Sequence, residues 1–366
     1  LSLYIHVPFC NSLCYYCACN KTVTRQRGKA GKFLKALEKE VDLVVEQLGN
    51  SRSVLDLHLG GGTPTWLSNQ EIQALAGILE KRIAFDASCD RAIEIDPRSI
   101  DEQTIECLAE LGFNRMSIGV QDLDHRVQRA INRVQPIELT RDVMERARAT
   151  GFRSVNLDLV YGLPFQTAAR FAKTVDKLLE LEPDRISLFR YAQLPKMFKA
   201  QRRIADASIP GSNVRDIIAD IARNKLLAAE YEPIGLDHFA LPHDDLAIAA
   251  RNGRLQRNFQ GYCARKGSDL IALGPSAISQ VGKCYAQNTR GFENWCSSLI
   301  SGKLPTERGL MLTRDDHIRR SVINTLMCSG HVDFPTVNTS WLIAVSYTHL
   351  TLPTMLAQCG GGGGGG

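Results

Sequence analysis

The sequence predicts an α/β fold in which six β/α units form a parallel sheet, curved into a partial (β/α)6 barrel with its helices outside. Three observations support this prediction. Short β-rich runs alternate with helical patterns over the first 190 residues. Cysteine-rich, glycine-rich or polar residues stand where these strands end, which is where barrel enzymes carry their chemistry. The chain has 366 residues, of which 44% are hydrophobic, enough for one large domain.

The expected strands are short runs of aliphatic and β-branched residues bounded by turn signals. They cover residues 3–6, 54–59, 92–95, 115–119, 154–159 and 185–189. Helical spacing of apolar residues, or a capping residue such as Ser68, predicts the helices between them. These cover residues 33–48, 68–81, 101–110, 122–150 and 167–181. Six successive units of this kind favour a parallel sheet.

The rest of the chain is less regular. Residues 211–231 show a further helical pattern, 234–304 are mixed and loop-rich, and another helix begins near Thr313. We therefore expect a partial barrel over 1–235, a mixed α/β extension over 236–304 and an incomplete helical C-terminal domain over 305–342. Residues 343–366 end in seven glycines and are expected to be non-native. The chain starts just before its first strand, so we expect truncation at both ends.

Composition excludes several functional classes. The net charge of +5 is distributed along the sequence rather than gathered in blocks, which argues against an extended nucleic-acid or membrane patch. No stretch approaches the ~20 apolar residues that span a bilayer. Residues 1–8 lack the basic and apolar regions of a secretory signal. We expect a cytoplasmic protein with no nucleic-acid or membrane partner.

Four of the eleven cysteines lie between positions 10 and 19, directly after the first strand. Clustering in a chain of this size is typical of metal binding rather than of disulfides. Cys10, Cys14 and Cys17 follow a C-x3-C-x2-C spacing and are expected to bind an iron–sulfur cluster. A zinc site, which needs four ligands, usually in separated pairs, and plain core cysteines are the alternatives. Three ligands would leave one iron open for a bound cofactor.

The run Gly60-Gly61-Gly62 follows the second strand and lets a ligand approach the backbone closely. Taken alone, such a run also fits an ordinary tight turn. The cysteine spacing together with this run resembles the radical S-adenosylmethionine (SAM) superfamily. That resemblance implies a partial TIM-like barrel and a 4Fe–4S cluster whose open iron is chelated by the methionine amine and carboxylate. Reductive cleavage of SAM would then give a 5′-deoxyadenosyl radical.

Over residues 1–342 the chain resembles one family more closely, the oxygen-independent coproporphyrinogen III oxidases. Nine segments carry this resemblance: 4–10, 17–21, 58–65, 94–97, 119–122, 156–164, 191–195, 235–240 and 257–262. The resemblance implies two bound SAM molecules. Residues matching the iron-bound molecule are Tyr4, Gly61, Glu94 and Ile278. Residues matching the second are Tyr16, Gly62, Thr63, Gln121, Arg133, Asp158 and Ala192.

Each of these residues also has a plainer interpretation. Tyr4 and Ile278 fit ordinary core positions, Glu94 and Asp158 fit helix caps or surface carboxylates, and Arg133 fits a solvated helix charge. The resemblance further implies a catalytic role for Cys19.

The implied substrate is coproporphyrinogen III, two of whose propionates become vinyl groups with loss of carbon dioxide, which gives protoporphyrinogen IX in haem biosynthesis. Arg25, Arg133 and Arg190 are candidates for holding propionates, because forked donors match carboxylates. The reaction also needs an electron donor and an electron acceptor, which the sequence does not identify, and the family implies a monomer.

Two related functions remain open at this point: a haem-binding chaperone of the same superfamily and a radical enzyme that degrades haem. Cys19 and the segment 257–262 favour the oxidase over the chaperone.

Overall fold

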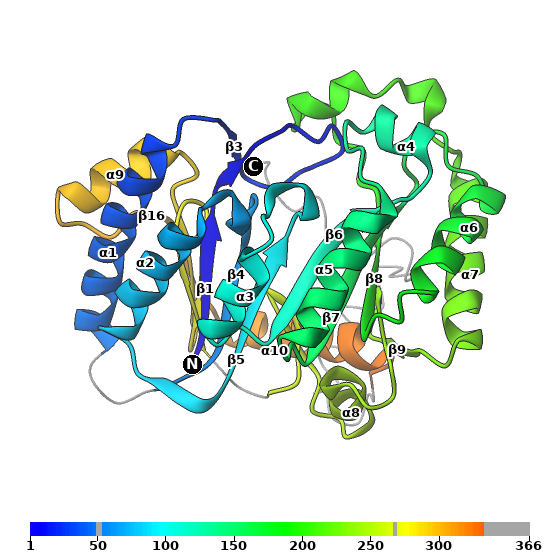
Figure 1. The fold of residues 1–366 in the computed structure, drawn as a ribbon. Coiled ribbons are helices and arrows are strands. Elements are labelled where there is room, and N and C mark those ends of the chain that lie inside the picture. Colours follow the sequence, from blue (N-terminus) through cyan, green and yellow to red (C-terminus); the bar gives the residue numbers. More distant parts are fainter. Residues whose placement is uncertain (49–52, 266–268, 333–366) are drawn as a thin grey trace.

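The computed structural model describes residues 1–48, 53–265 and 269–332. Its centre is a 12-stranded sheet in the order β16-β15-β14-β13-β1-β4-β5-β6-β7-β8-β10-β9 (Figure 1). Its middle six strands are parallel neighbours in chain order, which confirms the six predicted units. They are β1 (Ser2–Val7), β4 (Val54–Gly61), β5 (Phe85–Ile95), β6 (Arg115–Gln121), β7 (Ser154–Tyr161) and β8 (Arg185–Arg190).

Shorter strands extend the sheet at both edges. Beside β1, β13 runs parallel to it, and the next three strands continue antiparallel. Beside β8, β10 and then β9 are also antiparallel. These strands are β13 (Leu270–Leu273), β14 (Ile278–Val281), β15 (Cys284–Asn288), β16 (Thr306–Met311), β9 (Glu232–Ile234) and β10 (His238–Ala240). Two small separate pairs are β2 (Phe9–Cys10) with β3 (Thr22–Val23), and β11 (Gln256–Asn258) with β12 (Gly261–Cys263).

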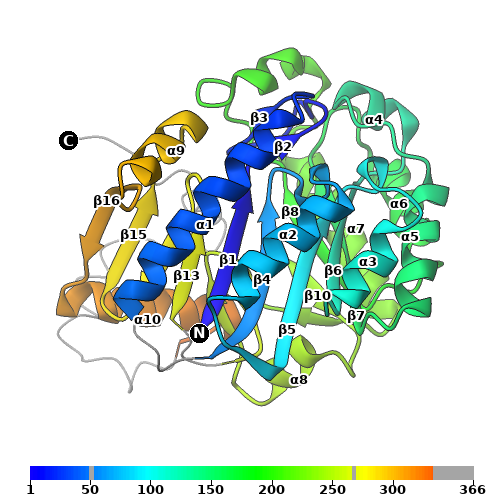
Figure 2. The ribbon, with the colours of Figure 1, turned by 60° about the vertical axis from the view of Figure 1, so that its left-hand side comes forward.

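The helices that follow the six parallel strands lie outside the sheet, as the predicted barrel requires (Figures 1 and 2). They are α1 (Gly28–Leu48), α2 (Asn69–Glu80), α3 (Thr104–Glu110), α4 (His125–Ala130), α5 (Ile137–Ala149), α6 (Ala168–Leu179) and α7 (Ser212–Ala228). The predicted cap is confirmed, because Ser68 and Glu71 form a reciprocal capping box at the start of α2. The predicted helical stretch 122–150 is two helices, interrupted at Asn132, which has a φ of 56°, and at Pro136.

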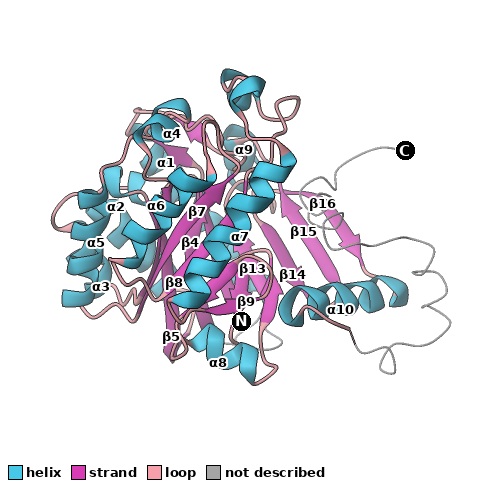
Figure 3. Ribbon diagram, turned by 90° about the vertical axis from the view of Figure 1, so that its right-hand side faces the viewer, coloured by secondary structure: helices cyan, strands magenta, loops and turns pink. Residues whose placement is uncertain are grey.

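The remaining helices pack beyond the barrel or in its loops. They are α8 (Asp245–Arg251), α9 (Phe292–Ile300), α10 (Arg314–Ser329) and the short 3-10 turns η1 (Pro64–Trp66), η2 (Pro97–Ser99), η3 (Lys199–Arg203) and η4 (Asp206–Ser208). A helix does begin after Thr313, which caps α10. Figure 3 shows α10 and β16 at one side of the molecule. The expected tail 343–366 lies outside the described residues, and the domain boundaries at 235, 304 and 342 stay predictions.

The hydrophobic core lies between the sheet and the outer helices and includes Ile5, Leu59, Ile118, Leu157 and Phe171, each at most 1% exposed. Because this face of each strand is packed, the opposite face is left to line a cavity. Within the described residues, no helix is both long enough and apolar enough to cross a membrane.

Candidate active site

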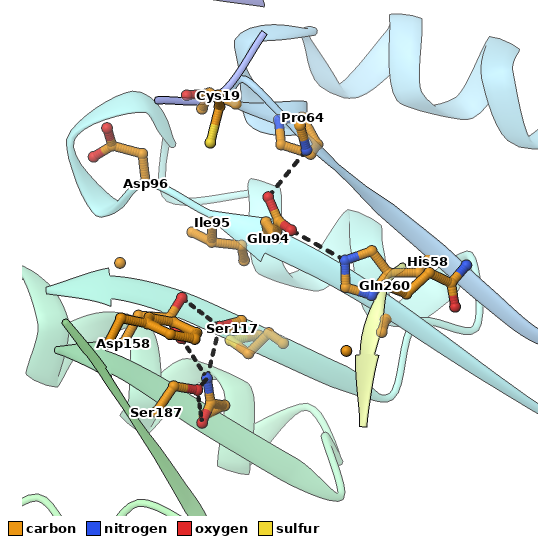
Figure 4. A pocket seen from close by; sticks show the side chains of 18 of the residues that line it. Cys19, His58, Pro64, Glu94, Ile95, Asp96, Ser117, Asp158, Ser187 and Gln260 are labelled. Carbon is orange, nitrogen blue, oxygen red and sulfur yellow. Dashed lines mark hydrogen bonds and ion pairs between the residues drawn. The ribbon is translucent and has the colours of Figure 1, made fainter. Parts of the chain in front are cut away.

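The opposite face of the parallel strands lines a cavity of about 860 Å³. Its walls come from β4 to β8, from the hairpin β11–β12 and from the cysteine loop, residues 10–19. The predicted placement of polar residues is confirmed, since Glu94, Gln121 and Asp158 all face this space. Figure 4 shows Glu94 and Asp158 on different strands of the wall, with Cys19 nearby.

The cysteine loop is braced by hydrogen bonds from both sides. The backbone N–H of Tyr15 donates to the Ile131 carbonyl at 2.9 Å, and Asn132 Nδ2 donates to the Leu13 carbonyl at 2.8 Å. From another segment, Gln201 Nε2 donates to the Tyr16 carbonyl at 2.9 Å. An irregular loop needs such external partners, because it has no ladder of its own.

The thiols of the loop have unequal environments. Cys10 and Cys14 are buried, Cys17 is half-buried and Cys19 is exposed to the cavity. Burial raises the pKa of the Cys10 thiol to about 11. A hydrogen bond from Cys19 lowers the pKa of the Cys17 thiol to about 5. The Cys19 thiol therefore stabilises the Cys17 thiolate and is itself accessible from the cavity.

The donor set fits a cluster better than a single ion. In the described residues, no three His, Cys, Asp or Glu side chains converge as ligands of one metal ion. The cysteines nevertheless face the same cavity and influence one another electrostatically. In a four-iron cluster each thiolate binds its own iron, so the ligands stand apart by the width of the cluster. The absence of a single-ion site in the described residues is therefore compatible with the predicted iron–sulfur site.

A charged network stands behind Cys14. Arg98 Nη2 lies 3.7 Å and Arg133 Nη1 lies 3.8 Å from its sulfur. Asp96 bridges the two guanidinium groups at 2.7 and 3.0 Å. Although burial opposes ionisation, Arg133 and Arg98 lower the pKa of Asp96 to about 2. Arg133 is only 6% exposed, so the interpretation of a solvated helix charge is wrong.

The glycine run brings the end of β4 against the cysteine loop and against Glu94. The N–H of Gly61 donates to Glu94 Oε2 at 3.1 Å, and His58 Nε2 lies 3.2 Å from Glu94 Oε1. Burial would raise the pKa of Glu94, but the hydrogen bond and charge of His58, with the Gly61 N–H, lower it. A Cβ on Gly62 would lie 2.7 Å from the Phe9 carbonyl oxygen, so this position requires glycine.

Asp158 lies in a network of neutral groups. Ser117 Oγ donates to Asp158 Oδ2 at 2.8 Å, and Asn156 Nδ2 donates to Asp158 Oδ1 at 2.8 Å. Asn156 Nδ2 also lies 2.9 Å from Ser187 Oγ, which extends the network to β8. Burial, helped by the charge of Glu94, raises the pKa of Asp158.

The structure brings most of the predicted site residues into the cavity wall. These are Cys10, Cys14, Tyr16, Cys17, Cys19, Gly61, Gly62, Thr63, Glu94, Gln121, Arg133, Asp158 and Ala192. Tyr4 and Ile278 are not among the lining residues. Tyr4 stands behind the wall, stacked on His58, with its hydroxyl 3.2 Å from His6 Nδ1. Ile278 lies half-buried on β14.

Four functional neighbours were not singled out from the sequence: His58 beside Glu94, Arg98 and Asp96 beside Cys14, and Asn156 beside Asp158. His58 and Asn156 each precede a recognised residue by two positions on a strand and so share its face. This two-residue spacing could have identified both residues from the sequence. No comparable sequence signal links Arg98 to Cys14, which is 84 residues away.

Comparison with known proteins agrees with this geometry. Residues 4–178 match the model of the radical SAM superfamily. The chain is 47% identical over 343 residues to the oxygen-independent coproporphyrinogen III oxidase of Pseudomonas aeruginosa, covering 93% of this chain and 75% of that one. It is 45% identical over 341 residues to the Escherichia coli protein of the same name, covering 93% and 74%.

A solved structure is similar over the whole described fold. It is that of coproporphyrinogen III oxidase (HemN) from Escherichia coli, described as a radical SAM enzyme, with a TM-score of 0.90 and 44% identity. The match covers 94% of this chain and 80% of that one. The cavity, its three cysteines and these relatives lead to one assignment. The chain belongs to the oxygen-independent coproporphyrinogen III oxidase family of the radical SAM superfamily.

Proposed function

We propose that the protein converts two propionates of coproporphyrinogen III into vinyl groups, without oxygen, to give protoporphyrinogen IX. One observation carries the proposal: Cys10, Cys14 and Cys17 open into the same 860 Å³ cavity as Glu94 and Asp158. A cavity of this size is within the range of clefts that bind small-molecule ligands. We further propose that the protein acts as a monomer in the cytoplasm, without a nucleic-acid or membrane partner.

When bound, the 4Fe–4S cluster and two SAM molecules would supply the radical chemistry by which a propionate loses a β-hydrogen atom, carbon dioxide and one electron. The chain's own residues bind and orient. Cys10, Cys14 and Cys17 hold the cluster. Glu94, kept ionised by His58 and Gly61, offers an anion to a cationic ammonium or sulfonium group. Asp158 offers hydrogen bonds to hydroxyl groups.

The propionates require cationic partners inside the cavity. Arg25 and Arg190 line it, and within the described residues neither forms a hydrogen bond or ion pair with another side chain. Arg133, the third candidate, is already engaged by Asp96 and by the Gly119 carbonyl at 2.6 Å. We therefore assign propionate binding to Arg25 and Arg190, since a free guanidinium can donate two parallel hydrogen bonds to a carboxylate.

The test of this function is anaerobic reconstitution with iron and sulfide, followed by reduction in the presence of SAM and coproporphyrinogen III. The expected products are 5′-deoxyadenosine and protoporphyrinogen IX. Formation of 5′-deoxyadenosine without protoporphyrinogen, combined with tight haem binding, would favour the chaperone and contradict the oxidase.

Cys19 can be separated from the cluster ligands by substitution. We expect Cys19→Ser to keep the visible and electron paramagnetic spectra of the cluster but to lose turnover, because Cys19 lines the cavity and stands outside the C-x3-C-x2-C spacing of the proposed ligands. Cys17→Ser should lose the cluster spectrum. Cys284→Ser, on β15 and outside the cavity lining, is the matched control and should keep both properties. Loss of the cluster in Cys19→Ser would make Cys19 a ligand.

A further inference from the structure

Basic residues are concentrated in two segments of the chain that contain no acidic residue. Residues 1–37, which include the cysteine loop, contain six Lys or Arg and no Asp or Glu. Residues 191–205 contain four more and again no acidic residue. The whole chain carries a net charge of only +5, so other regions are correspondingly more acidic. The expectation of an evenly spread charge therefore does not hold for these two segments.

The fold places these two segments together. Gln201 Nε2 donates to the Tyr16 carbonyl, and Arg203 Nη1 donates to the Tyr15 hydroxyl at 3.3 Å, with its guanidinium 5.2 Å from the ring centre. Figures 1 and 2 show the segment between β8 and α7 at the top of the molecule, beside the loop that leads to β3. Tyr15 and Tyr16 stand between Cys14 and Cys17 in the chain. The segment thus contacts the cluster-binding loop directly.

Four cations of this segment face outward, and we call them the η3 face: Lys196, Lys199, Arg202 and Arg203. All four are exposed, and none lines the substrate cavity. Within the described part of the chain, none forms an ion pair; Arg202 Nε donates to the Pro195 carbonyl and Arg203 to Tyr15. The nearest carboxylate in sequence, Asp206, accepts a hydrogen bond from Gln193. Neither internal ion pairing nor substrate binding in the cavity therefore accounts for this charge.

The η3 face also has an apolar centre. Met197 is 59% exposed and lies between Lys196 and Lys199 in sequence. The helix α4, which ends beside the cysteine loop, adds Arg126 and Arg129, both exposed. Protein interfaces are enriched in arginine and methionine relative to the rest of the surface. An exposed, flexible apolar side chain flanked in sequence by cations suits a short-lived complex with a negatively charged protein.

We propose that the η3 face docks an acidic one-electron carrier protein that reduces the cluster. This inference rests on the proposed function, which consumes one electron for each SAM molecule cleaved. The carrier is oxidised by one electron. With that electron the carbon–sulfur bond of the sulfonium breaks: two electrons stay on sulfur, which gives methionine, and one stays on carbon, which gives the adenosyl radical. Electron-transfer complexes use small interfaces and depend on charge complementarity for fast encounter. A carrier at this face would rest on the loop that bears the cluster ligands.

The experiment measures cluster reduction in the reconstituted protein with SAM but without coproporphyrinogen. The protein donor is reduced flavodoxin, an acidic flavoprotein, and the small-molecule donor is a photoexcited deazaflavin. The test variant is Lys196→Glu/Lys199→Glu/Arg202→Glu. Its matched control is Lys173→Glu/Lys177→Glu/Arg223→Glu, which makes the same charge change at exposed positions of α6 and α7.

We expect the η3 variant to slow reduction by flavodoxin at low ionic strength by roughly tenfold or more, as expected when electrostatic steering is removed. The control should change that rate less than about twofold, since its residues lie on the outer helices. Reduction by deazaflavin should be the same in all proteins. High ionic strength should slow the wild type toward the rate of the η3 variant.

Three results would overturn the proposal. One is equal flavodoxin rates in the two variants. Another is an unchanged rate with a raised KM for coproporphyrinogen, which would assign the face to substrate entry. The third is an unchanged rate with loss of single-stranded RNA binding. Failure to reconstitute any cluster would instead contradict the proposed function, so the two failures are distinguishable.

Discussion

Glu94 and Asp158 face the same cavity, but their surroundings shift their pKa values in opposite directions. The pKa of Glu94 is lowered because His58 and the Gly61 N–H outweigh the effect of burial. The pKa of Asp158 is raised because burial outweighs the hydrogen bonds from neutral groups such as Ser117. Both are carboxylates on strands, so the difference comes from the groups around them: His58 and Gly61 for Glu94, and Ser117 and Asn156 for Asp158.

This difference separates two kinds of ligand contact. An ionised carboxylate beside an imidazole and a backbone N–H suits a positively charged group, because opposite charge attracts strongly in a partly enclosed site. A carboxylate held among hydroxyl and amide groups suits hydroxyl groups, with which it exchanges hydrogen bonds of ordinary strength. The two sides of the cavity are therefore suited to ligand groups of different charge.

The largest expected effect is on the Glu94 side. Glu94→Gln keeps the shape but removes the negative charge. A charge-assisted hydrogen bond contributes up to about 3 kcal/mol, so we expect kcat/KM for SAM cleavage to fall roughly 100-fold. The measurement is the rate of 5′-deoxyadenosine formation by the reconstituted protein. A reduction no larger than that of Asp158→Asn would contradict the proposed difference between the two carboxylates.

A third buried carboxylate tests whether such shifts also govern stability. Glu40, on α1 and outside the cavity, accepts hydrogen bonds from Gly274 N, Asn288 Nδ2 and Trp295 Nε1. Burial dominates these bonds and raises its pKa from 4.5 to about 7. A raised carboxyl pKa contributes stability that is complete below the unfolded pKa and is lost as pH rises through the folded pKa.

The wild type should therefore gain stability relative to Glu40→Gln as the pH falls. We expect this gain to be roughly 1.5 kcal/mol between about pH 7 and about pH 5.5. The measurement is urea unfolding of both proteins at several pH values. Parallel pH profiles would show that Glu40 has the same proton affinity in the folded and unfolded chains.

The smallest effect is expected on the Asp158 side. Asn156→Ala removes one neutral donor from Asp158, together with the hydrogen bonds of Asn156 to Ser117 and Ser187. A neutral hydrogen bond contributes about 1 kcal/mol, so we expect about fivefold weaker SAM binding. Isothermal titration under anaerobic conditions measures this, and Asn213→Ala, exposed on α7, is the control. An effect as large as that of Glu94→Gln would remove the contrast between the two sides.

Sequence patterns predicted the parts of the molecule that depend on local order. The six parallel strands, the cysteine loop and the strand-end residues Glu94 and Asp158 follow from periodicity, spacing and resemblance. His58 could also have been singled out, because it shares a strand face with Gly60. These features depend on residues close together in the chain.

Other features depend on contacts between distant segments. Strand β13 pairs parallel with β1, and β14–β16 continue from it antiparallel, although more than 260 residues separate Ser2 from Leu270. Arg98 reaches Cys14 across 84 residues, and Gln201 reaches Tyr16 across 185. Strand register and loop packing decide such contacts, and neither is encoded by local periodicity. The same kind of contact places the η3 face beside the cysteine loop, which the sequence alone does not indicate.

The close fit of Gly62 against Phe9 has a consequence for protein engineering. The Gly62 N–H donates to the Val7 carbonyl at 2.8 Å, and Thr63 Oγ1 lies 3.5 Å from Cys10 Sγ. The residues at the end of β4 thus fix the backbone position at the start of the cysteine loop. Grafting that loop onto another barrel would require transplanting residues 60–63 with it. Exchange of either segment alone would remove the contacts that position Cys10, the first proposed cluster ligand.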